Sequence, residues 1–172
     1  MTPRDPRIDF FDAAAADWEA HMPPIGETLA RLDALADRLP LRPGDELLEL
    51  GCGAGGVTAW LLQRVRPGTV TAVDFSPEML RHARQRELDV EWVCHDICAA
   101  PPPGGPVDVV FCMHCFPHLR DQPAALRHLA AALNPGGHLV VLHLNHWRRI
   151  NETHDRIGGP VAGDHLPPPS DW

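Results

Sequence analysis

A glycine-rich loop between two apolar segments most constrains the fold of this chain. DELLELGCGAGGV at 45–57 runs from a strand-like segment into four glycines, and TVTAVDF at 69–75 carries Asp74 near its end. Glycines let the backbone turn sharply and let a ligand lie against bare peptide, and such a carboxylate can accept hydrogen bonds from ribose hydroxyls. The pair predicts a site for a nucleoside-containing ligand. GCGAGG fits both the GxGxG and the dinucleotide GxGxxG patterns, so the loop alone does not identify the nucleoside.

The residues around the loop favour a ligand that also carries positive charge. Glu49 precedes the first glycine by two residues. A carboxylate at this position would not help a loop to bind phosphate. It would, however, attract the ammonium or the sulfonium group of a positively charged ligand. A third strand-like segment, VEWVCHDI at 90–97, ends in Asp96 and Ile97. Asp96 could accept a hydrogen bond from an adenine amino group, and Ile97 could cover the ring.

The order of ELGCGAGG, VDFSPEML, HDI, DVVFCMHCFPHL and LNPGGHLVV resembles the class I S-adenosylmethionine-dependent methyltransferases, over residues 8–146. The resemblance implies S-adenosylmethionine as methyl donor, S-adenosylhomocysteine as product, and in-line transfer to a small-molecule acceptor. Two other functions stay open. One is a non-catalytic S-adenosylmethionine- or metal-binding member of this fold, and the other is an NAD(P)-dependent oxidoreductase, which the GxGxxG overlap allows.

The resemblance assigns site residues by position. Asp74 would hold the two ribose hydroxyls, Asp96 the adenine amino group, and Glu49 with the loop backbone the methionine part. The set expected at the cofactor comprises Glu49, Gly51, Cys52, Gly53, Gly55, Asp74, Phe75, Met79, Asp96, Ile97, His114 and Cys115. Local roles are the alternatives: Asp74 could cap a turn, Asp96 could be the N-cap of a turn at 97–100, and Phe75 and Met79 could be ordinary core residues.

The acceptor side is predicted from histidines near the ends of the fourth and fifth strands. A base is needed only when the acceptor must lose a proton, and the imidazole pKa suits that role. His114 and His118 are the candidate catalytic residues. Phe10, His143 and Asn145 are the candidate substrate contacts.

Alternating strands and helices predict an α/β fold: a three-layer, doubly wound, mainly parallel and Rossmann-like sheet with strand order 3-2-1-4-5. We expect residues 1–9 to be loose, residues 1–25 to hold an aromatic leader helix, and residues 26–172 to form the methyltransferase domain. The leader FFDAAAADWEAH either closes over the cofactor or packs on the sheet. The fifth strand is expected at GHLVVLHL, after NPGG ends a helix. The C-terminal strands of a complete methyltransferase are missing from 159–172. We therefore expect either a truncated domain, which we favour, or a reduced five-stranded sheet.

Composition narrows the partners. The 172 residues carry a formal net charge of −8 and no long basic run, so nucleic acid is not expected as a partner. No apolar run is long enough to span a membrane, so we expect a cytoplasmic protein with a small-molecule substrate. The five cysteines form no disulfide framework. Cys94 and Cys112 fall in strand-like runs, where buried thiols are expected, so no metal site is predicted. The sequence does not specify the oligomeric state.

Overall fold

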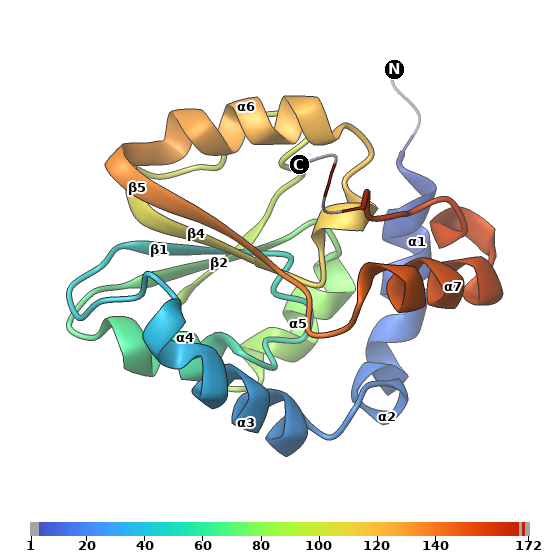
Figure 1. The fold of residues 1–172 in the computed structure, drawn as a ribbon, viewed down its shortest axis with the longest axis horizontal. Helices are drawn as coiled ribbons and strands as arrows, with labels where there is room; N and C mark the ends of the chain where they lie inside the picture. Colours follow the sequence, from blue (N-terminus) through green and yellow to red (C-terminus); the bar gives the residue numbers. More distant parts are fainter. Residues whose placement is uncertain (1–3, 169, 171–172) are drawn as a thin grey trace.

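The computed structural model describes residues 4–168 and 170 as a parallel five-stranded sheet between two layers of helices (Figure 1). The strand order is β3-β2-β1-β4-β5, which confirms the predicted topology. All four strand pairings are parallel. The strands are β1 (Leu47–Leu50), β2 (Val70–Asp74), β3 (Glu91–Cys94), β4 (Val107–Met113) and β5 (Leu133–Leu142).

The helices begin where the sequence places caps. Ser76 accepts a hydrogen bond from the backbone N–H of Met79 at 3.1 Å, and Pro77 takes the first helical position, as predicted. The described helices are α1 (Pro6–Ala14), η1 (Ala15–Asp17), α2 (Trp18–His21), α3 (Ile25–Leu35), η2 (Ala36–Arg38), α4 (Thr58–Val65), α5 (Pro77–Arg84), η3 (Phe116–His118), α6 (Gln122–Ala132), α7 (Trp147–Ile157) and η4 (Gly159–Val161). Within the described residues, none combines the length and the apolar character that a membrane crossing requires.

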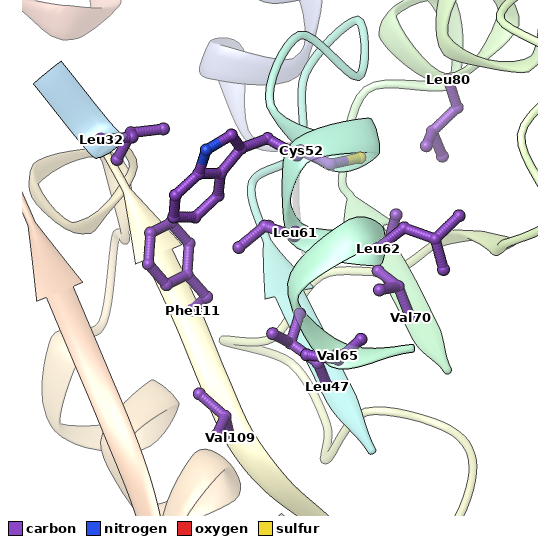
Figure 2. Packing of buried hydrophobic residues seen from close by; sticks show 12 residues of the cluster. Leu32, Leu47, Cys52, Leu61, Leu62, Val65, Val70, Leu80, Val109 and Phe111 are labelled. Carbon is purple, nitrogen blue, oxygen red and sulfur yellow. The ribbon is translucent and has the colours of Figure 1, made fainter. Parts of the chain in front are cut away.

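Two apolar clusters hold the layers together. In β1, Leu47 points to one face and Leu48 to the other, because successive strand residues alternate. On the first face, α3 and α4 pack through residues such as Leu32 and Leu61 against Phe111 of β4 (Figure 2). On the second face, α6 packs against β4 and β5, and α7 joins the same cluster. Burial of both faces explains why the strands read as continuous apolar runs.

Three expectations about local structure are wrong. Residues 1–9 are expected to be loose, but α1 already begins at Pro6. Asp5 caps this helix, because its carboxylate accepts a hydrogen bond from the backbone N–H of Arg7 at 3.0 Å. Residues 1–3 lie outside the described part of the chain. The segment NPGG does not separate helix from strand, since β5 already begins at Leu133. The pairing of β5 with β4 is irregular there, because its register shifts between Val107 and Val109 of β4. Cys94 is exposed, because β3 lies at the edge of the sheet.

The two ends of the described chain meet beyond the carboxyl ends of the strands. Figure 1 shows α1 beside α7 and the segment that follows it. Arg7 of α1 pairs with the buried carboxylate of Asp164 at 2.5 Å. Among residues 143–168 and 170 no further strand follows β5. The sheet edge formed by β5 is therefore open in this part of the chain.

Candidate active site

The loop after β1 is built on glycines that no other residue could replace cheaply. Gly51 has φ +70°, a backbone conformation that L side chains rarely adopt. A Cβ at this position would lie 2.3 Å from the Sγ of Cys115. Gly53 and Gly55 also have positive φ. The loop thus brings the end of β1 against the segment after β4 and leaves its backbone bare.

Asp74 joins the glycine loop to the end of β2. Its carboxylate accepts hydrogen bonds from the backbone N–H groups of Gly53 and Ser76, each at 2.8 Å. Burial raises its pKa to about 6, although these backbone bonds favour the ionised form. The turn-capping role named as an alternative is therefore present. Two acceptor bonds leave lone pairs on the carboxylate for further donors.

Glu49 is the second buried carboxylate of the loop, and only 2% of its surface is exposed. It accepts a hydrogen bond from the hydroxyl of Thr58, at the start of α4, at 2.6 Å. Burial raises its pKa to about 8, which the Thr58 bond only partly opposes. Glu49 is consequently neutral near pH 7 in this structure, and it ties the strand to the helix.

A pocket lies at the carboxyl ends of β1, β2, β3 and β4. Seven of the predicted site residues line it: Gly51, Asp74, Phe75, Asp96, Ile97, Cys115 and His118. The others lie outside the lining of this pocket: Phe10, Glu49, Cys52, Gly53, Gly55, Met79, His114, His143 and Asn145. Of these, Met79 is 1% exposed and packs in an apolar cluster with Phe11 and Ala15, as the core alternative expected.

Asp96 faces two partners at one end of the pocket. Its Oδ1 accepts from the backbone N–H of Cys98 at 2.9 Å, so the turn role named as an alternative is present. Its Oδ2 forms an ion pair with Arg120, which also lies 3.8 Å from Asp5. Any adenine amino group that binds Asp96 must therefore share the carboxylate with Arg120.

The acceptor-side histidines fall into two pairs. The rings of His114 and His143 meet edge to face, with centroids 5.2 Å apart. Burial lowers the pKa of His114 to about 4 and that of His143 to about 3, so both rings are neutral. Neither ring nitrogen of His143 has a hydrogen-bond partner within the described chain. His118 instead packs on His154, with ring centroids 4.7 Å apart. Asn145, two residues after His143 in the sequence, is exposed.

The local backbone at His114 is strained. This residue has φ +55°, in the left-handed region that only a few per cent of residues other than glycine adopt, with histidine among the more tolerant types. The backbone N–H of Leu144 donates to its Nε2 at 3.5 Å. Such outliers cluster at functional sites when the surrounding structure holds them.

Residues 47–137 match the family described as methyltransferase domain, which is more than half of the chain. The chain belongs to this methyltransferase family. The match confirms the resemblance read from the five motifs, because it spans the glycine loop, Asp74, Asp96 and the segment after β4.

Individual methyltransferases agree with this assignment. Trans-aconitate 2-methyltransferase of Azoarcus sp. (strain BH72) is 41% identical over 114 residues, which cover 66% of this chain and 44% of the relative. Ubiquinone biosynthesis O-methyltransferase of Xylella fastidiosa (strain 9a5c) is 33% identical, with 83% of this chain and 60% of the relative covered. The chain therefore spans about half the length of the curated methyltransferases it matches.

Two solved structures have the same fold. The structure titled "DhpI-SAM-HEP complex" superposes with a TM-score of 0.71 at 26% identity and covers 92% of this chain and 76% of that chain. A related structure, titled "DhpI-SAH complex structure", gives a TM-score of 0.69 at 27% identity, with 82% and 69% covered.

Several residues that line the pocket were not expected from the sequence. They are Asp5, His95, Cys98, Leu119 and Arg120. His95 and Leu119 belong to the motifs HDI and DVVFCMHCFPHL, and Cys98 and Arg120 directly follow these motifs, so the motifs could have indicated all four. Asp5 could not be found in that way, because α1 brings it to the pocket from the far N-terminus.

Proposed function

We propose that this chain binds S-adenosylmethionine and transfers its methyl group to a small-molecule acceptor. One observation carries the proposal: a single pocket at the carboxyl ends of the strands is lined by Gly51, Asp74, Asp96, Ile97 and His118. Ligands of open parallel sheets bind at this end, where the strand order reverses. Membership of the methyltransferase family and the two S-adenosyl ligands in the DhpI titles support the same donor.

The donor would lie across the ends of the strands. Asp74 would accept hydrogen bonds from the ribose hydroxyls, Asp96 from the adenine amino group, and Ile97 would cover the ring. The bare backbone at Gly51, together with Glu49, would serve the methionine part. When bound, the donor supplies an activated methyl group, so the chain has mainly to align an acceptor with it in a dry pocket.

We further propose that residues 1–25 are a leader that covers this donor, and that residues 26–172 are the methyltransferase domain. Phe11 of α1 packs on Phe75, with centroids 5.7 Å apart, and on His118 at 5.1 Å. Trp18 lies over the loop, where a Cβ at Gly53 would be 3.7 Å from its Nε1. The enclosed part of the pocket is about 30 Å³, room for a few waters at most. We expect the leader to shift when the donor binds.

The acceptor is proposed to be a small organic molecule with a carboxyl or hydroxyl group. The two curated relatives are named for trans-aconitate and for ubiquinone biosynthesis. A free donor and a small acceptor also suit a cytoplasmic location, which belongs to the same proposal.

The test is transfer of labelled methyl from S-adenosylmethionine. We would incubate the chain with trans-aconitate, a catechol carboxylic acid, a primary amine and a thiol, and detect methylated product by mass spectrometry. We expect one of these acceptor classes to be methylated and the other three to remain unmodified. A protein that binds the donor but methylates none of the four contradicts catalysis and leaves the non-catalytic alternative.

A further inference from the structure

The carboxylate of Asp164 lies at the centre of a buried polar cluster outside the family motifs. Its side chain is 1% exposed and is held by Arg7, whose Nε lies 3.0 Å from both carboxylate oxygens and whose Nη2 lies 2.5 Å from Oδ1. Its Oδ2 lies 2.7 Å from the Nδ1 of His118. The backbone carbonyl of Asp164 also bonds to His154. Three distant parts of the chain, which carry Arg7, His118 and Asp164, thus meet at this carboxylate.

This geometry fixes the tautomer of His118. A carboxylate held by an arginine can only accept, so the hydrogen bond from Nδ1 places the ring proton on that nitrogen. In the neutral ring, Nε2 then carries the free lone pair. Within the described residues Nε2 has no hydrogen-bond partner, and the side chain, 15% exposed, lines the pocket beside Gly51 and Cys115.

The ring is also fixed in orientation by its packing. Phe11 meets it edge to face at 5.1 Å, and the ring of His154 lies 4.7 Å away. Burial opposes ionisation of Asp164, but the hydrogen bonds from His118 and Arg7 outweigh it and hold the pKa of this carboxyl below its ordinary value. The negative charge beside Nδ1 is therefore permanent at neutral pH.

We infer that Asp164 is the positioning residue of a His118–Asp164 pair in which Nε2 of His118 takes the proton of the methyl acceptor. This inference rests on the proposed function. As the acceptor heteroatom forms its bond to the methyl carbon, the sulfur–methyl bond breaks and its electrons stay on sulfur, while the acceptor proton passes to Nε2. The positive charge of the sulfonium reappears on the imidazolium, where the carboxylate of Asp164 stabilises it.

The experiment compares Asp164→Asn with Asp155→Asn. The second variant is a matched control, because Asp155 bonds the exposed His165 at 2.8 Å in the same C-terminal part of the chain. The first readout is the ring-nitrogen tautomer of His118 in long-range ¹H–¹⁵N spectra, with His118→Gln used to assign the signals. The second is the split between kcat and the acceptor KM for the acceptor found in the transfer assay.

We expect wild-type His118 to carry its proton on Nδ1, with or without S-adenosylhomocysteine. Asp164→Asn should change the tautomer, because an amide can donate to Nδ1, and should lower kcat about 100-fold with little change in KM. Asp155→Asn should change neither. Arg7→Gln should leave the tautomer of His118 unchanged, since the carboxylate of Asp164 remains. This variant therefore distinguishes the effect of the Asp164 carboxylate from a general disturbance of the fold around it.

A wild-type ring protonated on Nε2 overturns the inference, and this measurement needs no variant to fold. So does an Asp164→Asn protein that keeps both the tautomer and kcat. Failure of the proposed function is seen separately, as absence of S-adenosylhomocysteine binding to the wild-type chain, which does not depend on the tautomer of His118.

Discussion

The backbone N–H of Gly53 donates a hydrogen bond to the carboxylate of Asp74 at 2.8 Å. This bond joins the loop after β1 to the end of β2, so the residue proposed to hold the ribose also shapes the bare loop beside it. Ligand binding and loop geometry are coupled through one side chain. Substitutions at Asp74 should therefore affect the donor site more than an ordinary surface carboxylate does.

Replacing Asp74 with Ala should weaken S-adenosylhomocysteine binding at least tenfold. The variant loses two charge-assisted hydrogen bonds to ribose, each worth about 1.5–3 kcal/mol. Isothermal titration calorimetry measures the change. The matched control is Asp108→Asn, since Asp108 lies at the opposite end of the sheet and bonds the backbone of Glu46 and the side chain of Asn134. A folded Asp74→Ala protein with wild-type affinity would refute the ribose role.

Replacing Glu49 with Gln should stabilise the protein at alkaline pH. The folded-state pKa of about 8 exceeds the ordinary value of 4.5, so the folded protein keeps a proton that the unfolded chain loses between these values. The free energy of unfolding of the wild type should thus fall relative to Glu49→Gln as pH rises from 4.5 to 8.

The difference should be near zero at pH 4.5 and reach about 5 kcal/mol above pH 8, because one pKa unit corresponds to about 1.4 kcal/mol. Gln can still accept the hydrogen bond from Thr58, so packing is preserved. Urea unfolding at several pH values provides the measurement. Parallel curves for the two proteins would show that Glu49 is ionised in the folded state.

The sheet and the cofactor loop could be predicted because their signals are local. The central strands β1 and β4 are largely apolar runs, and the glycines of the loop lie close together in sequence. The early start of α1 was missed although its signal, Asp5 before Pro6, is local too. The inclusion of NPGG in β5 could not be predicted, because Leu133 before this segment already pairs with Val107 and the chain bulges before the next pair, His138 with Val109.

The acceptor side could be predicted only in part. Sequence order placed His114 and His118 after β4, but the structure sends one ring toward His143 and the other toward His154. The partners of His118 could not be predicted, since Arg7 and Asp164 are 157 positions apart and meet only through tertiary packing. No rule based on the spacing of residues in the sequence predicts such a contact.

Replacing Phe11 with Ala should loosen the leader. Phe11 is 8% exposed and packs on Phe75 and Trp18, so truncation should lower the free energy of unfolding by about 3–5 kcal/mol. Chemical denaturation measures this loss. Leu126→Ala, at a residue 38% exposed on α6, is the control and should change stability by about 0.5 kcal/mol or less. Equal effects of the two substitutions would mean that α1 is not anchored through Phe11.

The two candidate catalytic histidines should differ in kinetics. His118→Ala should lower kcat by about 10²–10⁴-fold if its ring accepts the proton, with donor affinity nearly intact. His114→Ala should act mainly on the acceptor KM, because burial holds the pKa of His114 at about 4 and makes it a weak base. Steady-state kinetics with the identified acceptor separate the two. Unchanged kcat and KM in both variants would remove histidine from the acceptor site.

The most direct test of the account is a calorimetric titration of the wild-type chain with S-adenosylhomocysteine, NAD and NADP in turn. The pocket that joins the glycine loop, Asp74 and Asp96 predicts one site for S-adenosylhomocysteine with a dissociation constant on the order of micromolar, and no heat of binding for either nicotinamide. Binding of NAD or NADP without S-adenosylhomocysteine would contradict the central claim.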